Sequence, residues 1–327
     1  MKKNLLKVGI IGAGGMGSNH SECYKQMESK GVKVVAAADP DKARRTAAAA
    51  LHGCKVYKTG MELIAGEDLD IVDICTPSYL HTVHALAAMD KGRAVISEKP
   101  VCLTRFELQR LLKKQRQTGA DMAVAQCLRF WNEYEWLKNA ADKKTYGKVR
   151  SVVMTRLGAR PDRWFIEPEK SGGVILDLHI HDVDFLYYLL GEPDTVSVIH
   201  HRDKNGMADY ISGNYTYADA VASVEASWMQ MPSFPFTMAY RVNFEKADLL
   251  YDNRQTPALT VYPKDGKPFS PEFKGPASAY FKELDYFTDC LLNGKPFGRS
   301  TLAEVAPSLL LALKESKLAG GIIARKA

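Results

Sequence analysis

The chain has 327 residues, of which 46% are hydrophobic and 25% are charged, and its formal net charge is +6. This balance is typical of a folded globular protein and excludes a disordered or fibrous chain. Single hydrophobic cores stop growing at about 250–300 residues, so the length predicts two domains. Lysine and arginine are scattered and form no block that could follow a nucleic-acid backbone, so we expect no nucleic-acid partner.

The cysteines and apolar segments predict a cytoplasmic protein. The six cysteines include no CxxC pair, which is typical of reduced thiols and not of a disulfide framework. No apolar stretch reaches the roughly 20 residues that a membrane span needs. Glycines from Gly9 onward interrupt the first apolar run, which makes it a poor core for a signal peptide. We therefore expect a cytoplasmic location and no membrane partner.

The first 126 residues alternate between two kinds of segment. Short apolar runs typical of buried parallel strands lie at 5–11, 32–38, 71–75, 94–97 and 122–126. Segments with helical character lie between them, near 15–30, 41–52, 59–65, 79–91 and 104–118. Alternating strands and helices predict an α/β fold with a doubly wound parallel sheet, and we place this first domain at residues 1–126.

The pattern changes after Gln126. We predict a helix at 131–142, an alternating strand at 149–157, and a helix at 171–190 that ends before Gly191. Strand-like runs with short connections, which imply antiparallel pairing, follow at 195–201, 209–218, 220–230, 236–244 and 247–251. A loop at 263–276 and helices near 277–293 and 301–319 complete the chain. Residues 127–327 therefore form an α+β domain with a largely antiparallel sheet.

A glycine-rich loop follows the first predicted strand. Gly12, Gly14 and Gly17 form a GxGxxG pattern between a strand-like run and a helix start. Gly12 permits a tight turn, Gly14 lets the backbone approach a pyrophosphate, and Gly17 lets the helix pack on the strand. The helix N-terminus favours the negative charge of a phosphate. The pattern predicts a dinucleotide site, to which Gly15 and Met16 also belong.

Asp39 indicates which dinucleotide binds. It ends the second strand, 22 residues after Gly17, near the spacing of a ribose-binding acid. Its carboxylate would accept a hydrogen bond from a ribose 2′-hydroxyl and repel a 2′-phosphate, which favours NAD. Arg44 and Arg45 could offset that repulsion, although both also fit the solvent-exposed face of a helix. NAD is the predicted cofactor, and NADP is not excluded.

Two segments directly follow predicted strands, at the carboxyl ends of the strands, where open α/β sheets bind their ligands. Thr76 and Pro77 come after the fourth strand, where they either lie near the cofactor or cap the next helix. Glu98 and Lys99 come after the fifth strand, and a surface ion pair is the alternative interpretation. An ammonium group at Lys99 could hydrogen-bond a substrate oxygen and stabilise negative charge that develops on it.

An acid and an imidazole share one face of a helix in the second half. Asp177 and His181 are four residues apart, and a carboxylate beside an imidazole can handle a proton. At about 100° per residue, Asp184 and Tyr188 fall on the same side. This face is therefore polar, and the alternative is that it is merely exposed to solvent. His179 projects to the other side, so we expect a core histidine there and no metal site.

The motifs together resemble one family. The chain is similar to the glucose–fructose oxidoreductase and inositol dehydrogenase family (Gfo/Idh/MocA). The matching residues, in the family's order and spacing, are Gly12-Ala13-Gly14-Gly15-Met16-Gly17, Thr76-Pro77 with His81, Glu98-Lys99-Pro100, and Gly172-Gly173 with Asp177 and His181. They span residues 9–184, and the strand-rich remainder fits the family's second domain in outline only. His179 departs from the family pattern, in which a small residue is usual two positions before the catalytic histidine.

The resemblance implies a fold and a site. It implies an NAD(P)-dependent dehydrogenase acting on a sugar, cyclitol or related polyol, with Lys99, Asp177 and His181 as the catalytic group. It also implies a Rossmann domain followed by a domain whose open sheet supports homodimer or homotetramer contacts. The cofactor-binding residues inferred beside the glycine loop are Asp39, Thr76, Pro77, His81, Glu98 and Lys99.

In relatives, the segment just before the glycine pair, here Gly172-Gly173, lines the substrate cleft. Arg163 and Trp164 are therefore our candidate substrate contacts, together with Lys99, Asp177 and His181. The alternative is a core tryptophan beside an exposed arginine.

The predicted reaction is hydride transfer from a substrate C–H to the nicotinamide. His181 would accept the hydroxyl proton, Asp177 would orient the imidazole or bind a neighbouring hydroxyl, and Lys99 would position the reacting oxygen. One alternative is a redox-neutral enzyme, in which transient oxidation by bound NAD permits elimination, hydrolysis or epimerisation. Another is a non-enzymatic NAD-sensing regulator, although such a protein would not need this catalytic group.

Overall fold

The computed structural model describes residues 3–276 and 278–320. Two compact units make up the chain, the first comprising Met1–Phe130 with Ser278–Ala306 and the second Trp131–Ala277 with Pro307–Ala327. Residues 278–306 thus join the first unit, although the sequence places them in the second domain. Aromatic packing between Phe130 and Phe287, whose ring centroids lie 5.6 Å apart, is one reason for this.

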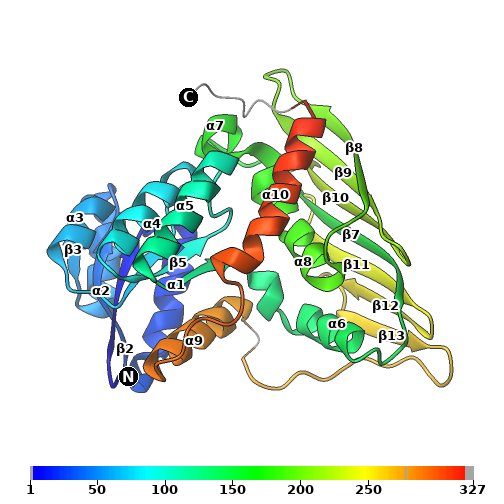
Figure 1. The fold of residues 1–327 in the computed structure, drawn as a ribbon, viewed down its shortest axis with the longest axis horizontal. Helices are drawn as coiled ribbons and strands as arrows, with labels where there is room; N and C mark the ends of the chain where they lie inside the picture. Colours follow the sequence, from blue (N-terminus) through cyan, green and yellow to red (C-terminus); the bar gives the residue numbers. More distant parts are fainter. Residues whose placement is uncertain (1–2, 277, 321–327) are drawn as a thin grey trace. The chain divides into compact units, whose positions relative to one another are not determined.

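The first unit is built on a six-stranded parallel sheet with the order β3-β2-β1-β4-β5-β6. Its strands are β1 (Leu6–Ile11), β2 (Val32–Ala38), β3 (Lys55–Tyr57), β4 (Ile71–Ile74), β5 (Ala94–Glu98) and β6 (Met122–Ala125). Its helices include α1 (Gly15–Gln26), α2 (Lys42–His52), α3 (Gly60–Gly66), α4 (His81–Asp90), α5 (Arg105–Thr118) and α9 (Ala279–Leu292), drawn around the sheet in Figure 1. The chain order reverses between β1 and β4, where open α/β sheets bind their ligands.

Burial explains why these strands are apolar runs. A parallel sheet covered by helices hides both faces of each strand. All of β4 and β6 is buried, and within β4 the one charged residue is Asp73. Helix starts follow local capping: the side chains of Asp41, Thr59 and Thr104 each accept a hydrogen bond from the first turn of α2, α3 and α5.

The second unit holds a seven-stranded, mostly antiparallel sheet with the order β13-β12-β11-β7-β10-β9-β8. The strands are β7 (Val149–Ala159), β8 (Thr195–Arg202), β9 (Ala208–Thr216), β10 (Val221–Gln230), β11 (Thr237–Phe244), β12 (Ala247–Asp252) and β13 (Leu259–Pro263). The pair β7–β10 is parallel, and the other pairs are antiparallel. The predicted α/β class, with a parallel sheet and a largely antiparallel one, is confirmed.

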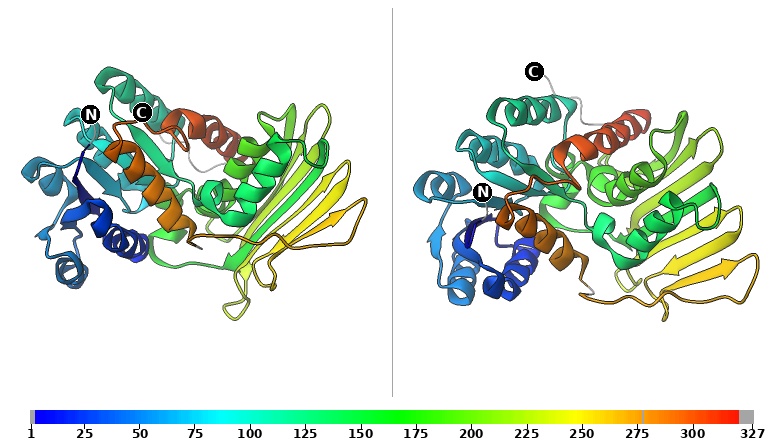
Figure 2. Two further views of the ribbon diagram at one scale, coloured as in Figure 1. Left: turned by 90° about the horizontal axis from the view of Figure 1, so that it is seen from below. Right: turned by 60° about the horizontal axis from the view of Figure 1, so that its bottom comes forward.

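Helices of this unit cover one face of its sheet. They include α6 (Asn132–Asp142), α7 (Pro168–Ser171), α8 (Ile180–Leu190) and the part of α10 (Leu302–Leu318) from Pro307 onward. Figure 2 shows α6 and α8 against the same side of the strands. Burial alternates along β10 and β12, as expected for a sheet with one packed face and one solvated face.

Candidate functional site

The glycine loop between β1 and α1 contains two glycines that the backbone requires. Gly12 has φ +92°, and a Cβ there would lie 2.6 Å from the carbonyl oxygen of Cys75. A Cβ on Gly17 would overlap the carbonyl oxygen of Gly12. Gly15, in contrast, has nothing within 4 Å of its Cβ position, and Gly14 has only the side chain of Arg44, at 3.4 Å. Two glycines therefore shape the loop, and two leave its outer side open for a phosphate to approach.

The N-terminus of α1 fits an anionic cofactor. Gly14 is the N-cap, so no side chain caps the helix, and its first turn contains no acidic residue. The first backbone N–H groups of a helix have no partners within the helix and carry partial positive charge. Together with the open side of Gly14 and Gly15, this end of α1 fits the pyrophosphate of a dinucleotide.

Asp39 ties the end of β2 to the glycine loop. Its carboxylate accepts hydrogen bonds from the backbone N–H groups of Ala13 and Asp41, at 2.9 and 2.8 Å. Each carboxylate oxygen can accept a second bond, so capacity for a ribose hydroxyl remains. Arg44 lies beside it, with Nη1 3.8 Å from Oδ2 of Asp39, whereas Arg45 donates to the backbone oxygens of Asp39 and Pro40. Arg44 is thus close enough to moderate the charge of Asp39.

His81 joins the two loops that follow β4 and β5. Its ring is buried, with Nδ1 2.8 Å from the carbonyl oxygen of Pro100 and Nε2 2.7 Å from that of Thr76. Both ring nitrogens therefore face protein backbone. The sequence places His81 among the cofactor-binding residues, and this geometry gives it an indirect part, in which it holds both loops in place.

Glu98 is engaged by protein on both of its carboxylate oxygens. Oε2 accepts a hydrogen bond from the backbone N–H of Lys99 at 3.1 Å, and Oε1 lies 3.3 Å from Nε2 of His20. Burial raises the pKa of Glu98, but its interactions with His20, Lys99 and His81 together leave the pKa below its usual range. Glu98 is therefore a buried carboxylate that holds the backbone of Lys99.

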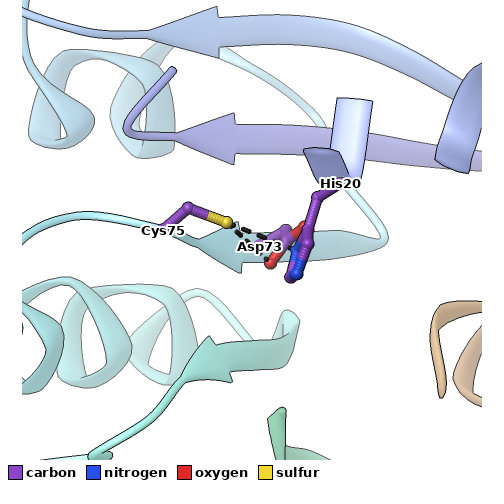
Figure 3. A group of neighbouring side chains, drawn as sticks. All are labelled: His20, Asp73 and Cys75. Carbon is purple, nitrogen blue, oxygen red and sulfur yellow. Dashed lines mark hydrogen bonds and ion pairs between the residues drawn. The ribbon is translucent and has the colours of Figure 1, made fainter. Parts of the chain in front are cut away.

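A buried cluster that the sequence analysis did not identify lies behind the glycine loop (Figure 3). Nδ1 of His20 lies 2.9 Å from Oδ2 of Asp73 and 3.3 Å from Sγ of Cys75, and that thiol lies 3.6 Å from Oδ1 of Asp73. The three groups are compact enough to hold a metal ion. Burial raises the pKa of Cys75 to about 12, so its thiol keeps its proton and donates to Asp73. A charged residue inside an otherwise apolar strand was the signal in the sequence.

Asp177 and His181 are the accessible residues of a buried segment in the second unit. All the remaining residues from 171 to 186 are buried, whereas these two are partly exposed. The alternative of a solvent-exposed polar face is wrong for Asp184, because it is buried and accepts a hydrogen bond from Ser308 Oγ at 2.6 Å. The joint action of this acid and imidazole stays a prediction.

The helix that carries this pair is irregular. The sequence predicts one regular helix at 171–190, but Ile175–His179 is a π-helical turn and α8 begins at Ile180. The projection at 100° per residue therefore fails across Asp177, because a π turn contains more residues than an α turn. Single π turns inside helices are frequent at functional sites. Before this turn, Gly172 and Gly173 have φ +78° and +67°, which glycine adopts without strain.

His179 lies in the core, as the sequence predicts. Its ring is fully buried, with Nε2 3.5 Å from Oε1 of Glu315 and 3.4 Å from the hydroxyl of Tyr215. Tyr215 also donates a hydrogen bond to Glu315. His179 is therefore part of the packing between the π turn, β9 and α10.

The two candidate substrate contacts lie in a short 3-10 turn, Arg163–Ile166. Arg163 is exposed and has φ 58°, a left-handed conformation that is strained for a residue other than glycine. Trp164 is half-buried and stacks on Phe165, with ring centroids 3.9 Å apart. Trp164 is thus not a core tryptophan, and the contact of both residues with substrate stays a prediction.

Comparison with known proteins identifies the family. A model described as "Oxidoreductase family, NAD-binding Rossmann fold" (GFO_IDH_MocA) matches residues 6–126, and the "GFO/IDH/MocA C-terminal domain" model matches residues 134–249. The chain belongs to the Gfo/Idh/MocA family. The resemblance drawn from the motifs is confirmed, as is the NAD-binding domain.

Relatives extend over most of the chain. Inositol 2-dehydrogenase of Rhizobium meliloti is 27% identical over 93% of this chain and 91% of its own length. The scyllo-inositol 2-dehydrogenase (NAD(+)) of Bacillus subtilis is 28% identical over 89% and 87%. Among solved structures, levoglucosan dehydrogenase in complex with NADH has a TM-score of 0.86 at 22% identity, covering 96% of this chain and 97% of that one. The predicted NAD-dependent oxidoreductase is thereby confirmed.

Proposed function

We propose that this protein is an NAD-dependent dehydrogenase that oxidises a CH–OH group of a sugar, cyclitol or related polyol. Relatives named as inositol and levoglucosan dehydrogenases support this substrate class. The observation that carries the proposal is the exposure of Asp177 and His181 within a segment that is otherwise buried. Proton transfer from a substrate hydroxyl requires an acid or base that the substrate can reach, and these two side chains are the ones in the segment that it can reach.

Each catalytic residue has a proposed role. His181 accepts the hydroxyl proton, because imidazole is the side chain that takes up and releases protons near neutral pH. Asp177 orients that imidazole or binds a neighbouring hydroxyl. Lys99 donates a hydrogen bond to the reacting oxygen and stabilises negative charge on it. Bound NAD supplies the hydride acceptor.

Cofactor and substrate are held by residues of different kinds. The open side of Gly14, Gly15 and the first turn of α1 at Met16 takes the pyrophosphate, and Asp39 takes the ribose. The loop at Thr76 and Pro77 lies at the carboxyl end of β4, where a parallel sheet binds its ligand. In the second unit, Arg163 and Trp164 contact the substrate.

The test is a screen of inositols and sugars with NAD and with NADP, followed by variants on the best substrate. We expect NADH to accumulate, and His181→Asn and Lys99→Met to lower kcat by about 100-fold or more with NAD affinity unchanged. His201→Asn, at an exposed histidine paired with Asp209 at 2.7 Å, is the control. Turnover without net NADH would instead indicate redox-neutral chemistry, and full activity in both variants would refute the assigned roles.

We also propose a cytoplasmic homodimer or homotetramer. Among the described residues, no helix is both long and apolar enough to cross a membrane. The sheet of the second unit exposes apolar side chains, among them Ile199, Val221 and Leu250. A second copy of the chain would cover these side chains. Light scattering coupled to size exclusion should give two or four chains, and Leu250→Glu should yield smaller species.

A further inference from the structure

We propose that His20 is a positioning residue of this dehydrogenase. Its imidazole, anchored by Asp73, fixes the carboxylate of Glu98, which in turn holds the backbone N–H of Lys99. The inference rests on the proposed catalytic role of Lys99. His20 is buried in α1, the helix that follows the glycine loop.

Contacts connect these residues in an unbroken series across three elements. His20 on α1 lies 2.9 Å from Asp73 on β4 through Nδ1 and 3.3 Å from Glu98 on β5 through Nε2. Glu98 then accepts the N–H of Lys99 at 3.1 Å. The side chains of His20 and Asp73 are fully buried and that of Glu98 nearly so, so the series is shielded from water. The helix proposed to hold the pyrophosphate is thus tied to β5, which ends at Glu98 directly before Lys99.

The ring must be charged to serve both carboxylates. A neutral imidazole carries one N–H, and its other nitrogen would then present a lone pair to a carboxylate. The imidazolium is protonated on both nitrogens, so it hydrogen-bonds Asp73 through Nδ1 and forms an ion pair with Glu98 at Nε2, where the 3.3 Å contact is not aligned as a hydrogen bond. Burial opposes that charge, yet the carboxylate of Asp73 beside Nδ1 helps to hold the pKa of His20 well above its ordinary value.

The surrounding groups support this charge arrangement. Glu283 on α9 is fully buried near Glu98 and Asp73, and burial raises its pKa well above the ordinary range, so it stays neutral. The Cys75 thiol is neutral as well, since its pKa is about 12. One cation thus lies between two carboxylates. Rotation of the Glu98 side chain would break the contact of Oε1 with His20 and that of Oε2 with the N–H of Lys99, so its position is fixed.

The two amide substitutions of His20 separate its two contacts. In His20→Asn the amide nitrogen replaces Nδ1 and keeps the bond to Asp73, whereas in His20→Gln it replaces Nε2 and keeps the contact with Glu98. We expect His20→Asn to lower kcat about 10- to 100-fold with the KM for NAD little changed, because displaced catalytic groups cost rate more than binding. His20→Gln should recover most of that loss.

His52→Gln is the matched control. His52 is a second buried histidine of the same unit, and its Nε2 contacts Ser21 Oγ at 2.9 Å. Its loss should change thermal stability but not kcat. A merely structural role for His20 predicts that His20→Asn and His20→Gln lose stability and leave kcat per NADH-binding site unchanged, as His52→Gln does, and that result would overturn the proposal.

A measurement on the unaltered protein does not depend on the variants folding. With NAD bound, histidine ¹⁵N spectra should show both ring nitrogens of His20 protonated at neutral pH, and a neutral ring would overturn the proposal. One zinc ion per chain that Cys75→Ser abolishes would also overturn it. If Lys99→Met retains activity while the His20 variants lose it, the proposed role of Lys99 fails. If Lys99→Met is inactive and both His20 variants match the wild type, only this inference fails.

Discussion

The buried ion pair beside His181 allows a quantitative prediction. Arg156 on β7 donates from Nε and Nη2 to Asp182 on α8, at 2.6 and 3.1 Å, and both side chains are buried. Asp182→Asn removes the negative charge that faces a buried guanidinium. Breaking one partner of such a pair costs about 3–5 kcal/mol, because the remaining charge loses its counter-ion without regaining water.

An exposed pair in the same unit provides the control. Lys148 and Asp219 lie 2.7 Å apart, with 59% and 65% of their side chains exposed. Solvent screens this pair, so Asp219→Asn should leave the free energy of unfolding almost unchanged. The chemical change is the same as in Asp182→Asn, and only burial differs.

Urea unfolding followed by circular dichroism gives the free energies. A loss of about 3–5 kcal/mol corresponds to a fall in Tm of roughly 6–20 °C for a unit of this size. The double variant Arg156→Met/Asp182→Leu should recover most of the loss, because an apolar pair has no charge to desolvate. Asp182→Asn within about 1 kcal/mol of the wild type, or a double variant no better than the single one, would refute the reasoning.

Three further predictions follow from the first unit. Gly12→Ala should lower Tm, because it forces a Cβ to 2.6 Å from the Cys75 carbonyl oxygen at φ +92°, whereas Gly15→Ala, with nothing within 4 Å, should not. Asp39→Ser should shift the kcat/KM ratio toward NADP while Arg44 remains, and adding Arg44→Ala should cancel the shift; an unchanged ratio contradicts the ribose assignment. Burial raises the pKa of Glu283 above its ordinary 4.5, so the native state keeps a proton that the unfolded chain releases, and stability is lost as pH rises above 4.5. In urea titrations, Glu283→Gln should therefore gain stability over the wild type as pH rises from about 5 to about 8, and a difference independent of pH would count against this.

Periodicity was enough to predict the strands of the first unit, with one exception. Strands covered on both faces must be apolar, so β1, β2, β4, β5 and β6 stand out in the sequence. β3 does not, because Lys55–Tyr57 is short and partly exposed at the sheet edge. The assignment of residues 278–306 to the first unit depends on aromatic packing with Phe130, which no local pattern encodes.

The glycine loop was predictable because Gly12 and Gly17 stand where the backbone permits no Cβ, whereas the pairing of Asp177 with His181 rested on a regular helix and stays a prediction. The His20 cluster was not predictable, because it depends on how α1 lies against β4, although Asp73 within an apolar run was a signal. The π turn was also missed, since the hydrogen-bond register of a helix leaves no mark on the apolar pattern over so few residues.

The proposed catalytic residues in both units adjoin a buried carboxylate in the chain. Lys99 follows Glu98, which contacts His20, and His181 precedes Asp182, which binds Arg156. Such carboxylates are unfavourable to bury, and an apolar pair would be as stable or more so. A charged pair, however, fixes orientation in a way that apolar contacts do not, because its hydrogen bonds are directional. The buried carboxylates hold the backbone of the residues next to them in the chain, and so limit where Lys99 and His181 can lie. The proposed hydride and proton transfers need such precise placement of the reacting groups.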